Sequence, residues 1–467
     1  MRITRRTVLA SAAVLLPRAA LAADNVSIRI DPRRRLRALP ADYMGLSFES
    51  SAVASLGLLS ADNPAYVQLV RTLGAQGVIR VGGNVSDYSH YDANGTPKNL
   101  PKNTVLTREN FRQLRTFLDA TGWRLIWGLN LGTGRLDNMV EEARAVADVV
   151  GDKLIAFEVG NEPDLFSHAG HRPAGYDYAA WHGEFRRYKA AIRAVLPAAP
   201  FAGPDIAMHS LDWMQSFAKD EAGDLALLTA HHYITGQENP ASTIQFMLAE
   251  EKKYQRVLSA FQSISRAARI PWRMCETSSF SGGGKAGVSD SFASALWALD
   301  YLFVLAGYDC AGFNMQTGIN HLGVLSKYTP INDDRAGRYT AAPEYYGLLA
   351  FAQAGKGEQI AVSLDTGGLN LTAYATRSGS NVTLTVINKD MRRDASLSIS
   401  GIAAKRAQVL RLSAPSLTAT TGITLGGAPV ETSGKWTGGK GDPVKLSGGR
   451  AVLEVPSGSA ALVTLAI

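Results

Sequence analysis

Between residues 40 and 350 of this 467-residue chain, short apolar runs alternate eight times with segments of helical periodicity. One helical segment carries Trp181, Phe185, Tyr188, Ile192 and Val195 at steps of three and four, as on one face of a helix. Apolar strands that alternate with helices are typical of a parallel sheet covered on both faces. Eight such units predict a closed (β/α)8 TIM barrel, with a doubly wound open sheet as the alternative. The predicted strands are residues 44–48, 77–81, 125–129, 154–159, 200–203, 228–233, 272–275 and 311–315.

After about residue 355 the apolar residues repeat every second position instead. Val382, Leu384 and Val386 alternate with threonines, and Gly, Ser and Thr fill the intervals between such runs. This pattern predicts a carboxy-terminal antiparallel β-sandwich. Residues 24–38 begin with the same alternation, so we expect them to add an amino-terminal strand to that sandwich. The predicted domains are the barrel at 39–352 and the sandwich at 353–467.

The first 23 residues have the features of a signal peptide. A basic start that includes Arg5 and Arg6 precedes a short apolar run, and small residues follow at 20–22. We expect export to the periplasm or the exterior, by a twin-arginine or an ordinary secretory route. Loss of this segment and its four arginines would take the formal net charge from +7 to about +3. That mild charge is no sign of a nucleic-acid partner, and the apolar run is too short to span a bilayer. We expect a monomer.

The sequence contains two cysteines, Cys275 and Cys310, both within apolar runs. Their spacing fits neither a disulfide framework nor a metal site, so we expect free buried thiols. A disulfide remains the alternative if their strands are neighbours. No zinc, calcium or phosphate-loop motif occurs in the sequence, and we predict no metal and no cofactor.

Two glutamates stand directly after predicted strands, Glu162 after the fourth and Glu276 after the seventh. In a TIM barrel the carboxyl ends of the strands carry the active site. Two carboxyl groups facing one another across this end fit a retaining glycosidase, which needs one protonated and one ionised group about 5–5.5 Å apart. Glu162 would be the acid/base and Glu276 the nucleophile. Each motif alone is also compatible with a solvated turn or a helix cap; their combination favours catalysis.

Other polar residues at the strand ends would support this pair. Asn161 would bind the sugar 2-hydroxyl, and Tyr233 would hold Glu276 in its ionised form. Arg80, from the second strand, would stabilise that charge. His231 is a further candidate for substrate contact, and Gln316 ends the eighth strand.

Five segments together resemble the heparanase and β-glucuronidase family of clan A retaining glycoside hydrolases. The resemblance extends over residues 24–467, because members of that family also join a barrel to a β-sandwich. The segment at 276–284 is the most specific of the five. The segments are 45–49 (GLSFE), 79–84 (IRVGGN), 160–163 (GNEP), 231–233 (HHY) and 276–284 (ETSSFSGGG).

The resemblance implies a glucuronic acid substrate whose carboxylate binds backbone amides of the glycine run, here Gly282 and Gly283. Glycine allows close backbone approach, and successive N–H groups bind anions. Glu49 and Asn84 fall where the family contacts sugar hydroxyls, and Lys285 would reach a sulfate or carboxylate on a neighbouring sugar. The family also uses a tyrosine near the eighth strand. Its counterpart here is open among Tyr328, Tyr339 and His321.

The resemblance therefore predicts a retaining endo-β-glucuronidase that cleaves heparan sulfate, a glycosaminoglycan, by double displacement. Three alternatives remain at this stage. The first is an exo-acting β-glucuronidase that releases terminal glucuronic acid. The second is another clan A glycosidase, such as an arabinofuranosidase or xylosidase. The third is an inactive carbohydrate-binding scaffold.

Overall fold

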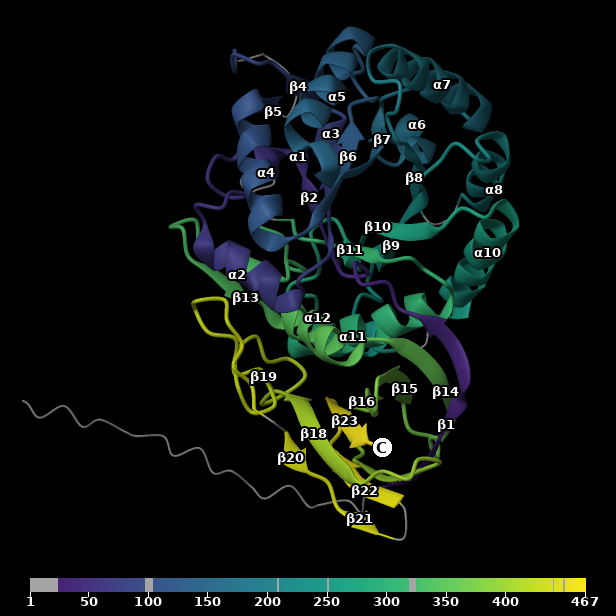
Figure 1. The fold of residues 1–467 in the computed structure, drawn as a ribbon, viewed down its shortest axis with the longest axis vertical. Helices are drawn as coiled ribbons and strands as arrows, with labels where there is room; N and C mark the ends of the chain where they lie inside the picture. Colours follow the sequence, from purple (N-terminus) through teal and green to yellow (C-terminus); the bar gives the residue numbers. More distant parts are fainter. Residues whose placement is uncertain are drawn as a thin grey trace, which may run out of the picture.

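The computed structural model describes residues 24–96, 104–207, 210–249, 252–318, 325–439, 441–447 and 450–467. The predicted export segment at 1–23 lies outside these ranges. The chain forms two stacked parts, a barrel and a large sheet (Figure 1). The predicted fold class, a TIM barrel with a carboxy-terminal β domain, is confirmed. Among the described helices, none combines the length and the apolar character that a membrane crossing needs.

Eight parallel strands of the described chain form the barrel, and each corresponds to one of the predicted apolar runs. Their order around the barrel is β7-β6-β3-β2-β11-β10-β9-β8. A bridge between Phe157 and Phe201 joins β7 to β8 and so closes the ring. The strands are β2 (Gly45–Glu49), β3 (Val78–Gly82), β6 (Arg124–Leu129), β7 (Leu154–Val159), β8 (Ala202–Ala207), β9 (Leu227–Gly236), β10 (Trp272–Ser281) and β11 (Phe313–Gln316).

Helices surround the barrel because each presents an apolar face to the strands. In α7 that face is formed by Trp181, Phe185, Tyr188 and Ile192, all buried. Four short strands extend the loops: β4 (Ser89–Tyr91), β5 (Thr104–Leu106), β12 (Ile331–Asp333) and β13 (Tyr339–Ala341). The helices are α1 (Ser50–Ala54), α2 (Pro64–Leu73), α3 (Gly83–Ser86), α4 (Arg108–Thr121), α5 (Leu136–Val150), η1 (Gly151–Lys153), η2 (Pro163–Leu165), α6 (Phe166–Ala169), α7 (Tyr178–Val195), α8 (Leu211–Asp220), α9 (Ile244–Met247), α10 (Lys252–Ala268), α11 (Phe292–Gly307) and α12 (Pro343–Ala354).

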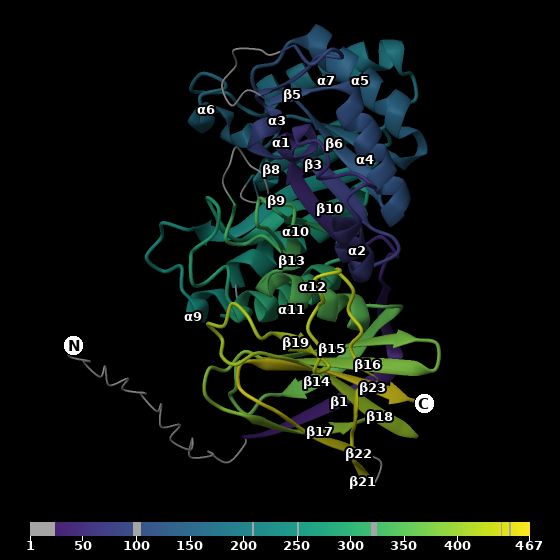
Figure 2. The same cartoon turned by 90° about the vertical axis from the view of Figure 1, so that its left-hand side faces the viewer.

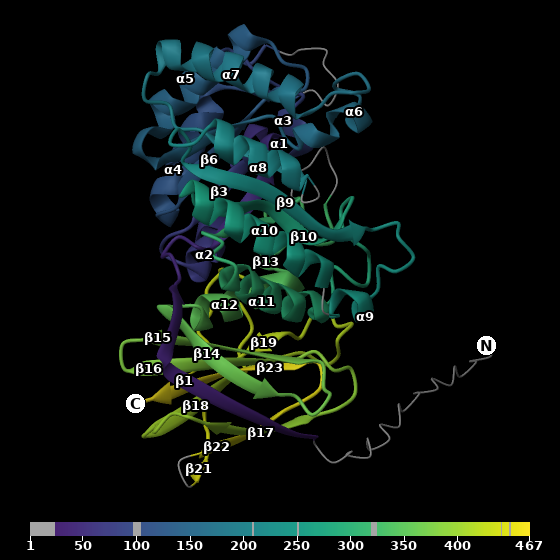
Figure 3. The same ribbon diagram turned by 90° about the vertical axis from the view of Figure 1, so that its right-hand side faces the viewer.

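The second part is a curved sheet in which the amino-terminal strand β1 (Asp24–Ala38) is an interior member. It pairs antiparallel with β14 and parallel with β17 (Figure 3), whereas the other pairings of this sheet among the described residues are antiparallel. The remaining strands are β14 (Glu358–Asp365), β15 (Leu371–Ser378), β16 (Asn381–Asn388), β17 (Ala395–Ser400), β18 (Arg406–Ser413), β19 (Thr424–Leu425), β20 (Asp442–Pro443), β21 (Leu446–Ser447), β22 (Arg450–Val455) and β23 (Ser459–Ala466).

Helices α11 and α12 lie between the barrel and the sheet (Figure 2). Thirteen of the sixteen residues of α11 are buried, as expected for a helix that is apolar on all sides. Leu412 and Leu462 of the sheet belong to the same hydrophobic core as the barrel helices. The two parts therefore share one core, which fixes the barrel on the sheet. Cys275 and Cys310 are free buried thiols, as the sequence indicated.

Candidate active site

A cavity of about 740 Å³ opens where the barrel strands end, and both predicted catalytic glutamates line it. Its volume lies within the range of about 300–1,000 Å³ that is usual for ligand sites. Its wall includes the residues at the ends of β2, β9, β10 and β11, so the strand ends of the barrel supply the site. The predicted residues that line the cavity are Glu49, Asn84, Glu162, His231, Tyr233, Glu276, Gly282, Gly283 and Gln316.

Glu276 lies within β10 and is held through both of its carboxylate oxygens. Arg80 Nη1 donates to Oε2 at 2.9 Å, and the Tyr233 hydroxyl donates to Oε1 at 2.7 Å. Arg80 comes from β3 and is fully buried. These two contacts fix the orientation of the carboxyl group in the cavity. Burial and the neighbouring Glu276 charge raise the pKa of Tyr233 well above its usual value, so the hydroxyl keeps its proton.

Glu162 follows β7 and has a left-handed backbone conformation, with φ of 50°. Two backbone bonds hold it there: its N–H donates to the Asp205 carbonyl at 2.9 Å, and its carbonyl accepts from the Leu165 N–H at 2.8 Å. Non-glycine residues adopt this conformation at a cost of about 1–3 kcal/mol, and such residues gather at functional sites. The side chain, 19% exposed, contacts His231 Nδ1 through Oε1 at 3.1 Å.

His231 bridges Glu162 to a buried carboxylate, Asp205. Its Nε2 lies 2.7 Å from Asp205 Oδ1, so both ring nitrogens have protein partners. Burial lowers the pKa of His231, but the Asp205 carboxylate and the bond to Glu162 outweigh it and raise the pKa well above the usual value. A protonated His231 donates to Asp205 and to Glu162. Sequence reasoning assigned His231 to substrate contact; the structure gives it this bridging position in the cavity wall.

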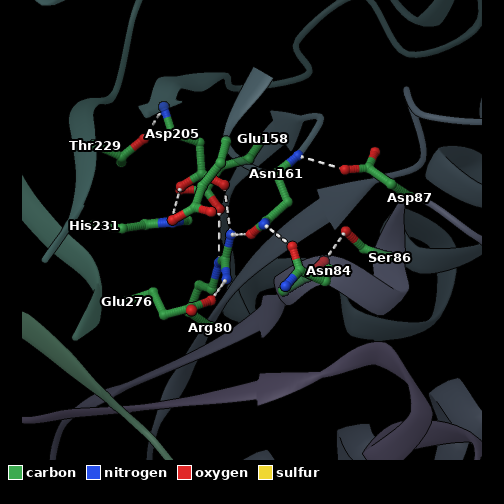
Figure 4. Close-up of polar contacts among 12 residues, drawn as sticks. Arg80, Asn84, Ser86, Asp87, Glu158, Asn161, Asp205, Thr229, His231 and Glu276 are labelled. Carbon is green, nitrogen blue, oxygen red and sulfur yellow. Dashed lines mark hydrogen bonds and ion pairs between the residues drawn. The ribbon is translucent and has the colours of Figure 1, made fainter. Parts of the chain in front are cut away.

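Figure 4 shows the polar network around Arg80. Arg80 donates to Glu158 at 3.0 Å, to Asp205 at 2.5 Å and to Asn161 Oδ1 at 3.0 Å, in addition to Glu276. Asn161 is buried and hydrogen bonds through Nδ2 to Asn84 Oδ1 at 3.3 Å. Asn84 lines the cavity and Asn161 does not, so the predicted contact of Asn161 with the 2-hydroxyl stays a prediction.

The glycine run after β10 forms one side of the cavity. Gly282, Gly283 and Gly284 all have positive φ, at 78°, 95° and 82°. The Gly282 carbonyl accepts from Gln237 Nε2, and the Gly283 carbonyl accepts from the Lys327 N–H at 2.6 Å. The amides of Gly282 and Gly283 donate to no residue that the structure describes. Successive amides without a protein partner can bind an anion. We refer to the two amides of Gly282 and Gly283 as the glycine nest.

Tyr328 lies beside this nest, with its ring centroid 5.9 Å from that of Tyr233, and it lines the cavity. Burial and then the Glu276 charge raise its pKa, which keeps it a neutral hydrogen-bond donor. Tyr339 packs against Tyr66 instead and does not line the cavity. The third candidate, His321, lies outside the described residues. The structure therefore favours Tyr328 as the tyrosine of the site.

Three further predicted site residues, Glu49, Gln316 and Lys285, differ in burial and in hydrogen bonding. Glu49 is buried and accepts the Val85 N–H at 2.8 Å. Gln316 is 2% exposed, and its Oε1 has no hydrogen-bond partner among the described residues. An orphaned buried acceptor in a cavity wall is available to a ligand hydroxyl. Lys285 is half-buried and does not line the cavity.

Sequence reasoning missed Asp205, Glu158 and Asp87, which are all buried charged residues near the site. Asp87 accepts the N–H groups of Leu131, Gly132 and Asn161. Burial raises the pKa of Asp87 to about 7 in spite of these bonds. Its role is to fix the loop that carries Asn161. In none of the described ranges are three or more His, Cys, Asp or Glu side chains grouped as a metal ion would require.

The sequence is similar to known carbohydrate-active enzymes. Residues 368–462 match the glycosyl hydrolase family 79 C-terminal beta domain. The chain is 26% identical to a β-glucuronidase of Aspergillus niger, over 66% of this chain and 63% of the fungal protein. It is 28% identical to a β-glucuronidase of Neurospora crassa, over 61% of this chain and 57% of that protein. A mouse heparanase is 29% identical over 43% of this chain and 39% of its own length. The chain thus spans about three fifths of the two β-glucuronidases.

Solved structures show the same architecture. The crystal structure of a 4-O-α-L-rhamnosyl-β-D-glucuronidase from Fusarium oxysporum superposes with a TM-score of 0.77 at 20% identity, over 94% of this chain and all of that one. A family 51 α-L-arabinofuranosidase from Bifidobacterium longum superposes with a TM-score of 0.70 at 13% identity, over 95% of this chain and all of that one. At these identities the likeness shows the fold alone.

Proposed function

We propose that this chain, a relative of the β-glucuronidases and heparanases of glycoside hydrolase family 79, hydrolyses β-glucuronides with retention of configuration. One observation carries the proposal. The carboxylate of Glu276 is fixed by Arg80 and Tyr233 in the same cavity as Glu162, and two glycine amides in that cavity are left for an anion. The first feature supports a nucleophile, and the second supports a sugar with a carboxylate.

The reaction follows from these positions in two steps. In the first, Glu276 Oε attacks the anomeric carbon while Glu162 gives its proton to the glycosidic oxygen, and the alcohol leaves. In the second, the ionised Glu162 takes a proton from water, which attacks the same carbon and frees Glu276. Two inversions at one carbon give net retention. Throughout, protonated His231 hydrogen bonds to Glu162 and stabilises its charge after proton transfer.

Substrate discrimination would come from the nest. The substrate carboxylate would accept the N–H groups of Gly282 and Gly283 and the Tyr328 hydroxyl, while Glu49, Asn84 and Gln316 would meet ring hydroxyls. Hydrogen bonds to a charged acceptor are about twice as strong as neutral ones. A glucoside, which has a hydroxymethyl group in place of the carboxylate, would lose this contribution.

The test compares p-nitrophenyl β-glucuronide with p-nitrophenyl β-glucoside and follows the first anomer released by NMR. The proposal expects a kcat/KM that is at least ~100-fold higher for the glucuronide, with the β-anomer of glucuronic acid appearing first. Equal rates on both substrates would reject the carboxylate site. Initial release of the α-anomer would reject retention.

A second candidate is the endo-acting cleavage of heparan sulfate predicted from the sequence. Two cations flank the nest, Lys285 directly after the glycines and Lys327 directly before Tyr328, and either would attract a sulfated neighbour of the bound sugar. The sequence match to the mouse heparanase also supports it. The longer matches to the fungal β-glucuronidases support exo action. Size-defined heparan sulfate oligosaccharides separate the two: mid-chain fragments indicate endo cleavage, and free glucuronic acid with stepwise shortening indicates exo cleavage.

We also propose that the protein is exported, on the basis of the basic and apolar pattern at residues 1–23. A polymeric or conjugated glucuronide outside the cytoplasm would then be the accessible substrate. Amino-terminal sequencing of protein from the periplasm and the medium tests this. A chain that keeps its first residues and stays in the cytoplasm would contradict export.

A further inference from the structure

Glu158 is a fully buried carboxyl group that the mechanism above does not use. It lies on β7, four residues before Glu162, and its carboxyl group points toward Arg80 and Asp205 (Figure 4). Arg80 Nε donates to its Oε2 at 3.0 Å. Its Oε1 accepts from no donor among the described residues. Leaving one oxygen of a buried carboxylate without a hydrogen-bond donor is costly, and burial itself disfavours the charge, so the protonated form is favoured.

The ionisable neighbours of Glu158 come from the barrel strands that pack around it. Arg80 comes from β3, Asp205 from β8, His231 from β9, and Cys275 and Glu276 from β10. On β6, the residue level with Glu158 is Gly128, which has no side chain. The positive charges of Arg80 and His231 are already paired with the carboxylates of Asp205 and Glu276, and His231 also contacts Glu162.

Asp205 is the partner of Glu158 in this set. Its two oxygens accept from Arg80 and from His231. The Glu158 carboxyl group accepts from the neighbouring Nε of the same Arg80 guanidinium, so the two carboxyl groups lie side by side on one cation. Two carboxyl groups can form a hydrogen bond only if one of them carries a proton. Burial and the Asp205 charge raise the pKa of Glu158, although Arg80 opposes the shift. Burial acts in the same sense on Asp205, but Arg80 and His231 outweigh it and lower its pKa. The proton therefore belongs to Glu158.

We propose that Glu158 and Asp205 share one proton below the cavity, and that this carboxyl pair is a positioning device that keeps the charge of the active site balanced. The inference rests on the proposed function of the site. In the free enzyme, the charges of Arg80 and His231 match those of Asp205 and Glu276. In the glycosyl-enzyme, Glu276 becomes an ester and Glu162 becomes the second carboxylate, and the balance is unchanged.

Ionisation of Glu158 would break this arrangement. The two carboxylates would repel one another, and Asp205 would move away from His231, from Arg80 and from the Glu162 N–H that its carbonyl accepts. The surplus negative charge would also oppose the ionisation of Glu162 that the second step needs. We therefore infer that turnover falls as pH rises through the titration of Glu158.

The decisive substrate is 2,4-dinitrophenyl β-glucuronide, because its leaving group needs no proton from Glu162. The wild-type enzyme should lose kcat and kcat/KM by about tenfold per pH unit on the alkaline side. In Glu158→Gln, the NH2 group of the glutamine can donate to Asp205 at every pH. The amide oxygen of the glutamine can still accept from Arg80. This variant should retain acid-side activity within about threefold and show its alkaline loss at least about one pH unit higher. An unchanged alkaline limb in a folded Glu158→Gln enzyme would overturn the proposal.

The matched control is Glu142→Gln. Glu142 is also buried with a pKa raised to about 7 by burial, but it faces Trp127 on the outer side of the barrel. Its substitution should leave the alkaline limb where the wild type has it. A shift equal to that of Glu158→Gln would mean that any buried carboxyl moves the profile, and would also overturn the proposal.

Neutron diffraction of the deuterated wild-type protein gives a readout that needs neither a variant nor an activity. The proposal expects one deuteron between the Glu158 and Asp205 carboxyl groups at mildly acidic pH. Its absence would refute the pair. If the wild type hydrolyses no glucuronide, the proposed function fails, while the neutron map still decides whether the carboxyl pair exists.

Discussion

Arg80 and Glu276 form an ion pair of 2.9 Å in which the arginine is fully buried and the glutamate reaches the cavity. The other carboxylate oxygen accepts from Tyr233. Glu276 is therefore fixed in one orientation before any substrate arrives, as a nucleophile should be if reorganisation is not to add to the barrier.

Tyr233→Phe removes the hydroxyl at 2.7 Å from Glu276 and leaves the ring. A hydrogen bond to a charged group contributes about 1.5–3 kcal/mol. We expect kcat for p-nitrophenyl β-glucuronide to fall about 10–100-fold with KM within about threefold. Steady-state kinetics with a circular dichroism check of folding measures this. A larger change in KM than in kcat would place Tyr233 on the substrate instead.

Tyr328→Phe should have the opposite kinetic signature. Its ring lies beside Tyr233 and the glycine nest, and we assign its hydroxyl to the substrate carboxylate. We expect KM for the glucuronide to rise about tenfold, for one lost charge-assisted bond. KM for the glucoside should stay unchanged. Equal effects on the two substrates would remove Tyr328 from the carboxylate site.

Gly283→Ala tests the nest against a control in the same loop. Both Gly283 and Gly287 have positive φ, at 95° and 74°, so alanine costs about 1–2 kcal/mol at either position. A Cβ at Gly283 would meet Ser326 Oγ at 3.8 Å, and one at Gly287 would meet nothing within 4 Å. We expect similar losses of stability by urea unfolding, but a rise of about tenfold or more in glucuronide KM for Gly283→Ala alone. A rise in both variants would point to loop strain as the cause.

Glu142→Gln should change the pH dependence of stability. Glu142 accepts from Trp127 Nε1 at 2.8 Å, and burial raises its pKa to about 7. A raised folded-state pKa means that the stabilisation is fully present below the unfolded value of about 4.3 and is lost as pH rises through about 7. Relative to the variant, the wild type should lose up to about 1.4 kcal/mol per pH unit in that window. Urea unfolding at pH 5 and pH 8 measures it. The same difference at both pH values would contradict the assignment.

The barrel was predictable because strands that are buried on both faces appear in the sequence as continuous apolar runs. Glu162 and Glu276 could be located for the same reason, since strand order fixes which strands meet. The seventh strand was predicted to end at Cys275, whereas β10 continues past Glu276 to Ser281. Arg80 was predictable from a single charge inside an apolar strand. Arg80 and Tyr233 both contact Glu276, as the sequence predicted.

Asp205 and Glu158 were missed although the same kind of signal was present. The fifth strand was predicted to end at Gly203, whereas β8 continues to Ala207 and carries Asp205 into the barrel. Glu158 stands inside an apolar strand, as Arg80 does, but nothing in the sequence pairs the two. The nest could be inferred only through the family resemblance, because three glycines alone predict a flexible loop equally well. Which carbonyls are bonded and which amides remain is a property of the folded loops.

The most direct test of the central claim is covalent trapping with 2-deoxy-2-fluoro-β-glucuronyl fluoride, followed by mass spectrometry of the digested protein. The account predicts one added sugar per chain, on the peptide that contains Glu276, and no label in Glu276→Gln. A label on a different carboxyl group, or full turnover by the enzyme without any glycosyl-enzyme, would contradict it.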